Sequence, residues 1–282
     1  MDFIMTTLNE LKFESPSFFA RIKSMLGVDF YRLFHTPLFY IFLMIAAFIP
    51  ALILGAGGME NPDGTASALL YTNVWNAIAA DTPLYAFSNI GEYANMNMVF
   101  IFGGIMVSIF IGHDYKSGYV KQLFTTHSKK MDYMISKSIT CAFAMACMCI
   151  MYLLGAVAGG LFVGLDFSCS VPSLLIAIVS KKIMSLGWAS LYTFLNVIFR
   201  RYFGVSIGSS FLFGTGLPII AIGMIFGNTT GSVLNIFLYG SSVYACLSSN
   251  IVTLLVCLVV SVVWAVIYNG LGTALLSKSD VY

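Results

Sequence analysis

Long apolar runs constrain the fold of this chain more than any other feature of its sequence. Six of them come close to the roughly 20 apolar residues that a helix needs to cross a hydrocarbon layer about 30 Å thick. The sequence therefore predicts an all-α polytopic membrane protein with six transmembrane helices. We expect a single transmembrane domain over residues 1–282. The predicted spans are Leu38–Ala56, Asn95–Gly112, Ser138–Gly164, Ile183–Phe199, Gly204–Phe226 and Ile251–Leu276.

Composition agrees with a membrane protein and excludes a soluble one. Hydrophobic residues make up 59% of the chain and charged residues only 9%, whereas a soluble domain carries about 25% charged residues. The basic residues stand in short clusters beside the apolar runs, so nothing predicts nucleic-acid binding. Residues 1–37 include acids and bases, so we interpret the first apolar run as a retained span and not as a signal peptide.

The distribution of basic residues predicts the orientation of the chain. If the chain crosses the membrane six times, all but two of its 14 Lys and Arg residues lie on one side. The exceptions are Lys181 and Lys182, just ahead of the fourth span. Because cytoplasmic loops carry an excess of basic residues, both termini are expected in the cytoplasm. A seventh span at Ala66–Phe87 would break this pattern, and its Asp81 and Pro83 favour a short external helix and turn instead.

The predicted spans contain no Asp, Glu, Lys, Arg or His well inside them. A charge at the bilayer centre costs roughly 2.5–3.5 kcal/mol on insertion scales and is kept mainly where function requires it. This pattern disfavours carriers coupled to protons or Na⁺, although backbone carbonyls and hydroxyls could still bind Na⁺. His113 and Asp114 have no further metal-ligating residues around them, so neither a metal site nor a catalytic site is predicted. The pattern G-x-x-x-x-G-K-[ST] is also missing, so any ATP would be hydrolysed by another polypeptide.

Two amphipathic segments are expected at the cytoplasmic boundary. Apolar residues recur every three or four positions in Ser17–His35, which predicts a helix lying in the membrane interface. Thr36-Pro37 then supplies a break before the first span. Between the second and third spans, residues 113–137 carry five lysines and a short helix opened by Ser117-Gly118. This loop could pass force to a soluble partner, or its lysines could simply meet anionic lipid, and the residues alone leave both interpretations open.

The order of these features resembles the membrane subunit of type 2 ABC exporters, the ABC-2 permease family. The resemblance covers nearly the whole chain: an interfacial elbow helix, six spans, and a cytoplasmic coupling helix between spans two and three. Tyr119 stands where the family more often has Thr, and His127 replaces its usual Pro, so the ends of the coupling helix differ from the family pattern. The matching segments are Asp114–Gly118, Lys121–Phe124, Ser128–Lys130 with Lys137, Leu33-Phe34, and the Arg200-Arg201 turn.

The resemblance implies a subunit that pairs with itself or with a related permease and forms the translocation pathway. Two cytoplasmic ABC ATPase subunits would dock on the elbow helix and on the loop 113–137. They would bind ATP and Mg²⁺, while this chain would bind no cofactor and would not be an enzyme. The expected setting is the plasma membrane of a bacterium, and the expected substrate is an antimicrobial peptide or another amphiphile. The residues expected at the ATPase-coupling surface are Arg21, Arg32, Asp114, Lys116, Gly118, Tyr119, Lys121, Leu123 and Phe124.

Small and hydroxyl-bearing residues of the second and fifth spans are candidates for the pathway and the dimer interface. Small residues let membrane helices approach closely, so packing within one subunit explains the same pattern. Pro218 removes a backbone hydrogen bond and predicts a kink near Gly214–Pro218, which suits a gate and nearly as well a tolerated packing defect. The candidates are Gly104, Ser108, Ser206, Ser209, Ser210, Thr215 and Pro218.

Two other functions remain open from the sequence. A non-transporting membrane scaffold or sensor could use the same cytoplasmic loop to bind a soluble partner. An ion-coupled carrier or channel is the second alternative, which the scarcity of charge in the spans disfavours.

Overall fold

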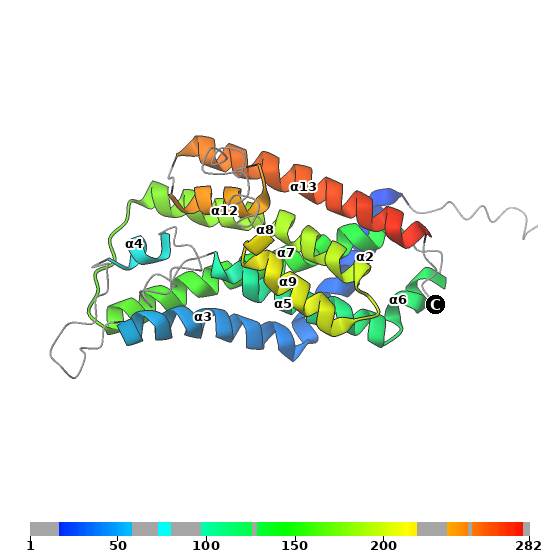
Figure 1. Cartoon of the computed structure of the whole chain (residues 1–282), viewed down its shortest axis with the longest axis horizontal. Coiled ribbons are helices and arrows are strands. Elements are labelled where there is room, and N and C mark those ends of the chain that lie inside the picture. The colour runs from blue at the N-terminus through cyan, green and yellow to red at the C-terminus, as the bar shows by residue number, and fades with distance from the viewer. Residues whose placement is uncertain are drawn as a thin grey trace, which may run out of the picture.

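The computed structural model describes residues 17–57, 73–79, 97–125, 129–218, 236–247 and 250–278. This part of the chain is helical, and its only β-type pairing is one isolated bridge between Asn73 and Asp166. Figure 1 shows the helices in chain order. They are α2 (Phe18–His35), α3 (Pro37–Gly57), α4 (Val74–Ala79), α5 (Met98–Lys116), α6 (Tyr119–Thr125), α7 (Lys130–Phe162), α8 (Val171–Ile198), α9 (Phe203–Gly214), α12 (Leu238–Leu247) and α13 (Ile251–Lys278).

Five of the described helices, α3, α5, α7, α8 and α13, are long and apolar enough to cross a membrane. This is the pattern of a helical, multi-pass membrane protein, as predicted. The sixth predicted span, Gly204–Phe226, begins as α9, which is apolar but has only 12 residues. The remainder of that span from residue 219 onward lies outside the described residues, so the sixth crossing stays a prediction.

Helix α8 corrects the predicted start of the fourth span. The helix begins at Val171 and not at Ile183, and its 28 residues rise about 42 Å. The predicted span began just after Lys181 and Lys182 because lysine is costly in lipid. In the structure, Lys181 is buried inside the protein while Lys182 is exposed, so the helix continues through Lys181 without exposing that charge to lipid.

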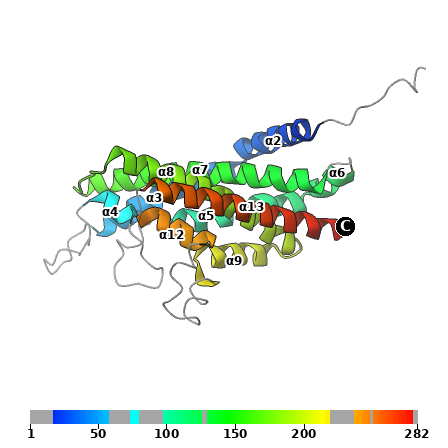
Figure 2. The same ribbon diagram turned by 90° about the horizontal axis from the view of Figure 1, so that it is seen from above.

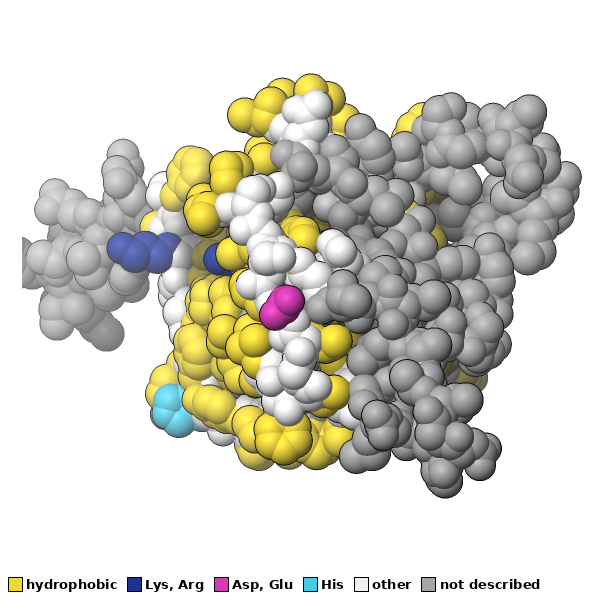
Figure 3. All heavy atoms as spheres, turned by 90° about the vertical axis from the view of Figure 1, so that its left-hand side faces the viewer, with side chains coloured by type: hydrophobic (Ala, Val, Ile, Leu, Met, Phe, Trp, Pro, Cys, Tyr) yellow, Lys and Arg dark blue, Asp and Glu magenta, His cyan; other side chains and the backbone are white. Residues whose placement is uncertain are grey.

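The two ends of the bundle differ in which helices meet there. At one end, which we call the basic end, α2, α6, the start of α7 and the end of α13 come together (Figure 1). There the Lys130 ammonium of α7 donates a hydrogen bond of 2.6 Å to the backbone oxygen of Leu276 in α13. At the opposite, far end, the backbone N–H of Val74 in α4 donates to the backbone oxygen of Asp166 over 2.9 Å. Viewed from the far end, the described side chains are mostly hydrophobic (Figure 3).

Helix α7 packs closely against α3 through two of its glycines. A Cβ atom on Gly155 would lie 1.9 Å from the backbone oxygen of Ala47, and one on Gly159 would lie 2.4 Å from Cα of Ala51. The line of small residues therefore serves close helix contact within the chain. Helix α2 lies alongside the first half of α7 (Figure 2), where the ring of Phe30 meets that of Phe143 at 5.2 Å.

Charged side chains of the described helices lie at two levels of the bundle. Asp114 and Lys137 lie towards the basic end. Lys181 lies level with the start of α5, because its ammonium donates to the side-chain oxygen of Asn97. Between these two levels, the described parts of α3, α5, α7, α8, α9 and α13 carry no Asp, Glu, Lys, Arg or His. The predicted charge-poor centre is present, although α7 begins at Lys130, ahead of the predicted Ser138, and so includes Lys137.

Candidate functional site

A buried group of four charged side chains, here called the ion cluster, joins three helices at the basic end. Lys137 of α7 is its centre, with Nζ 2.7 Å from Oδ1 of Asp29 in α2 and 2.7 Å from Oδ2 of Asp114 in α5. Arg32 of α2 donates through Nη2 to Oδ1 of Asp114. The hydroxyl of Ser136 donates to the other oxygen of Asp29 over 2.6 Å. The cluster therefore consists of two cations and two carboxylates that pair with one another.

Aromatic rings surround the two cations of the ion cluster. The guanidinium of Arg32 lies 4.1 Å from the ring centroid of Tyr119, and the ammonium of Lys137 lies 4.8 Å from that of Phe110. Such contacts stabilise cations that have lost water. Burial lowers the pKa of Arg32, but the hydrogen bond and charge of Asp114 raise that pKa, and the net change is upward. Arg32 therefore stays charged throughout the physiological pH range, and the cluster connects α2, α5 and α7.

A second ion pair fastens the beginning of α2 to the beginning of α7. Nε of Arg21 lies 2.8 Å from Oδ2 of the buried Asp132. Beside this pair, a cavity of about 370 Å³ opens between α2, α6 and α7, and Tyr119 and Leu123 line its α6 side. This volume lies within the range of about 300–1,000 Å³ that is typical of ligand pockets. We call it the α2–α6 cavity.

Helix α6 lies directly after Ser117-Gly118, where the sequence predicts a short helix. Gly118 has φ +73°, a left-handed conformation that glycine adopts without steric cost, and it turns the chain from α5 into α6. Val120 is buried, while Leu123 and Phe124 are half-buried. The ring of Phe124 meets that of Tyr133 at 5.7 Å. The apolar face of α6 thus packs onto the protein.

The predicted coupling residues lie in three different places in the structure. Arg32 and Asp114 belong to the ion cluster, the ring of Tyr119 lies against Arg32, and Arg21 pairs with Asp132 nearby. The Lys116 ammonium lies 4.1 Å from the ring centroid of Phe203 in α9, which ties the end of α5 to α9. Lys121 is exposed, as is its neighbour Gln122, so the outward face of α6 is polar.

Three acids and bases of this site were not among the predicted coupling residues: Asp29, Asp132 and Lys137, of which only Lys137 was named, as part of the family resemblance. A signal for Asp29 was present, because it falls within the apolar stripe of the amphipathic helix Phe18–His35, close to the buried Leu33. A charge on the buried stripe of a helix needs a partner. The sequence alone does not reveal that the partner is 108 positions away.

The predicted pathway residues Ser108, Ser206 and Ser210 also come together, in a second buried cluster between α5, α8 and α9. The hydroxyl groups of Ser108 and Ser210 are 2.7 Å apart. Asn196 of α8, which sequence reasoning missed, donates to the Ser108 hydroxyl over 3.2 Å and accepts from the Ser206 hydroxyl. These groups hold three helices of one chain together.

The other pathway candidates also make contacts within the chain. A Cβ on Gly104 would lie 2.8 Å from the ring of Tyr192, so this glycine makes room for a core aromatic residue. The hydroxyl groups of Ser209 and Thr215 donate to backbone oxygens of α9 itself, at 2.9 and 2.8 Å. Helix α9 ends at Gly214, a few residues before Pro218, in the region where a break was predicted.

Comparison of the sequence with models of known protein families and with curated proteins found no match.

Proposed function

We propose that this chain is the membrane-spanning permease subunit of an ATP-driven ABC exporter, working as a dimer with separate cytoplasmic ATPase subunits. The observation that carries the proposal is the position of the α2–α6 cavity beside the ion cluster. A soluble partner that binds there would contact two short amphipathic helices that are joined rigidly to the long helices α5 and α7. The resemblance of the sequence to the ABC-2 permease family supports the same function.

The α2–α6 cavity supports a docking role because it combines space with an accessible polar rim. Ala20, Ser24 and Val28 of α2 line one side, and Tyr119 and Leu123 of α6 line the other. Ser24 is exposed at the edge of the cavity, and the outward side of α6 carries a lysine and an amide. A helix or loop of an ATPase subunit could therefore enter the cavity and form hydrogen bonds along its edge.

The ion cluster supports transmission of movement from this surface into the membrane. Tyr119 at the start of α6 contacts Arg32, which binds Asp114 at the end of α5. Asp114 in turn binds Lys137 of α7. Separating a buried ion pair is costly, at about 3–5 kcal/mol when one partner is removed. A push on α6 would therefore move the ends of α2, α5 and α7 together and leave the cluster intact.

The outer face of α9 supports pairing with a second copy or a related permease. Gly204 and Gly208 lie one turn apart, and a Cβ on either would meet nothing within 4 Å. Exposed Val205, Phe211 and Leu212 lie on the same helix. An open surface of small and apolar residues permits close contact between membrane helices.

In this proposal, the basic end faces the cytoplasm of a bacterium and both termini lie on that side, following the excess of basic residues. The partner ATPase binds ATP and Mg²⁺, and this chain performs no chemistry. The exported substrate would be an antimicrobial peptide or another amphiphile, as the resemblance implies.

The decisive experiment isolates the tagged full chain from its host membrane and identifies co-purifying proteins by mass spectrometry. The exposed α6 residues are replaced as Lys121→Glu with Gln122→Glu, because Leu123 and Phe124 pack inward and their replacement would disturb the fold. Lys182→Glu with Asn76→Glu makes the same change of charge at exposed positions near the far end. We expect the wild type and the control to retain an ABC ATPase, and the α6 variant to lose at least nine-tenths of it.

Two outcomes would overturn this proposal. The first is a wild-type chain that retains no protein with the motifs of an ABC ATPase, which would favour the scaffold or sensor. The second is an α6 variant that retains the ATPase as well as the control does. Purified complexes in vesicles should also move substrate only when ATP is supplied.

One observation favours a second candidate, the ion-coupled carrier. Lys181 is fully buried within α8 and donates to the side chain of Asn97 and to the backbone oxygen of Ser242, the latter over 2.8 Å. Ionisable residues buried in membrane helices often mark ion or proton pathways. Transport that persists without ATP and depends on a proton or Na⁺ gradient would support this candidate over the exporter.

A further inference from the structure

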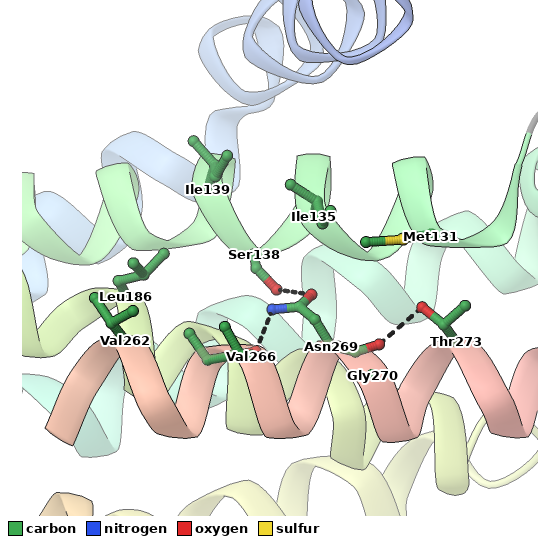
Figure 4. Close-up of a pocket in the computed structure, with 11 residues that line it drawn as sticks. Met131, Ile135, Ser138, Ile139, Leu186, Val262, Val266, Asn269, Gly270 and Thr273 are labelled. Carbon is green, nitrogen blue, oxygen red and sulfur yellow. Dashed lines mark hydrogen bonds between the residues drawn. The ribbon is translucent and has the colours of Figure 1, made fainter. Parts of the chain in front are cut away.

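An apolar groove of about 420 Å³ runs between α7 and α13 on the outer surface of the bundle, with Leu186 of α8 at its floor (Figure 4). Met131 and Ile135 line the α7 side, and Val266 and Gly270 line the α13 side. Gly270 helps to create the hollow, because a Cβ at this position would meet nothing within 4 Å. The groove therefore lies between two helices that are long and apolar enough to cross a membrane.

The polar atoms in the wall of the groove already have partners. The hydroxyl of Ser138 donates to the side-chain oxygen of Asn269 over 2.9 Å, and the Asn269 amide donates to the backbone oxygen of Ala265 over 2.8 Å. The hydroxyl of Thr273 donates to the backbone oxygen of Asn269 over 2.7 Å. Figure 4 shows these bonds lying along the wall. An apolar occupant would therefore leave no hydrogen-bonding group in the wall unpaired.

Basic residues adjoin the groove along the chain at the basic end of the bundle, where Lys129 stands two residues before Met131 and Lys278 five residues after Thr273. Lys129 and Lys278 are both exposed. The neighbouring Lys130 bridges the two helices by donating to the backbone oxygen of Leu276 over 2.6 Å. An apolar groove that ends at a cluster of cations matches an amphiphile with an apolar tail and an anionic head.

We propose that this groove binds one acyl chain of an anionic phospholipid, whose phosphate headgroup is held by Lys129 and Lys278. Basic pockets between membrane helices attract anionic headgroups, and each lysine near an anionic surface adds to the attraction. The occupant is a bilayer lipid because the groove opens sideways on the lipid-facing surface. Val266 at its edge is 68% exposed. The inference does not depend on the proposed export function.

The test uses the purified full chain in nanodiscs that contain a trace of phosphatidylglycerol with a photoactivatable acyl chain. Matched phosphatidylcholine serves as the zwitterionic comparison. After illumination, labelled peptides that cover residues 131–139 and 262–273 are quantified by mass spectrometry. We expect phosphatidylglycerol to label these peptides several-fold more than phosphatidylcholine does.

Two pairs of variants separate the apolar and the charged parts of the site. Gly270→Leu fills the groove and should abolish its labelling by both lipids, whereas Gly27→Leu, at an equally open helical glycine of α2, should leave labelling unchanged. Lys129→Gln with Lys278→Gln should lower labelling by phosphatidylglycerol about five-fold for each lysine removed. Lys23→Gln with Lys182→Gln removes the same charge from other exposed positions and should leave labelling unchanged.

Val266→Phe fills the groove from an exposed position and provides a second test if Gly270→Leu does not fold. The proposal is overturned if a folded groove-filling variant is labelled as strongly as the wild type. It is equally overturned if both lipids label the groove to the same extent, or if the Lys129 and Lys278 variant behaves like its control.

Discussion

Replacing Lys137 with methionine should destabilise the protein more than any change to an exposed lysine. Its ammonium lies 2.7 Å from a carboxylate oxygen of Asp29 and 2.7 Å from one of Asp114. Lys137→Met keeps much of the volume of the side chain but leaves both acids without this partner. Removing one partner of a buried ion pair costs about 3–5 kcal/mol, because a charge remains buried and unpaired.

The loss in the free energy of unfolding should fall within this range and not reach twice its value, because each acid keeps one other partner. Asp114 keeps Arg32, and Asp29 keeps the hydroxyl of Ser136. For a chain of this size, the midpoint of thermal unfolding should fall by roughly 6–20 °C. The assay is tryptophan fluorescence of detergent-purified protein during heating.

Two further variants test the reasoning. Lys182→Met changes an exposed lysine on α8 and should move the midpoint by no more than a degree or two. Asp29→Asn combined with Lys137→Met removes one orphaned charge and should recover part of the lost stability. If Lys137→Met unfolds within two degrees of the wild type, the ion cluster is not the joint described above.

Two further predictions concern packing in the core. Gly155→Leu should prevent stable folding, because its Cβ would lie 1.9 Å from the backbone oxygen of Ala47. The measurement is the yield of monodisperse protein on size exclusion, and Gly27→Leu, in open space, is the control. Tyr192→Phe should cost about 0.5–1.5 kcal/mol, because the buried hydroxyl donates to the backbone oxygen of Phe100 over 2.8 Å and the variant loses this hydrogen bond. Unfolding at the wild-type temperature would show instead that water or another group replaces this bond.

The positions of the apolar helices could be predicted from the sequence because they depend on local properties. Length and apolarity of consecutive residues place α3, α5, α7 and α13 near their predicted ranges. The periodicity of residues 17–35 predicts α2, and Ser117-Gly118 predicts the turn into α6. The same local rule failed at Lys181, because whether a lysine in a helix faces lipid or protein depends on its neighbours in space.

The composition of the candidate site could be predicted only in part. Arg32 and Asp114 were expected at the ATPase-coupling surface, and in the structure they bind each other. Ser108 and Ser210 were candidates for a pathway, a dimer interface or packing within one subunit, and in the structure their hydroxyl groups bind each other between α5 and α9. In each case the sequence identified polar residues that need partners, but not which partners they have.

The sequence by itself thus determined that the chain is a multi-pass helical membrane protein, where most of its helices lie, and which residues are costly to bury. Each of these depends on the chemistry of neighbouring residues along the chain. Only the tertiary structure decided that Asp29 pairs with Lys137, 108 positions away, and that an apolar groove forms between α7 and α13. The physical reason is that a buried charge pairs with the opposite charge that lies closest in space. Packing of the long helices sets both those distances and the shape of the surface.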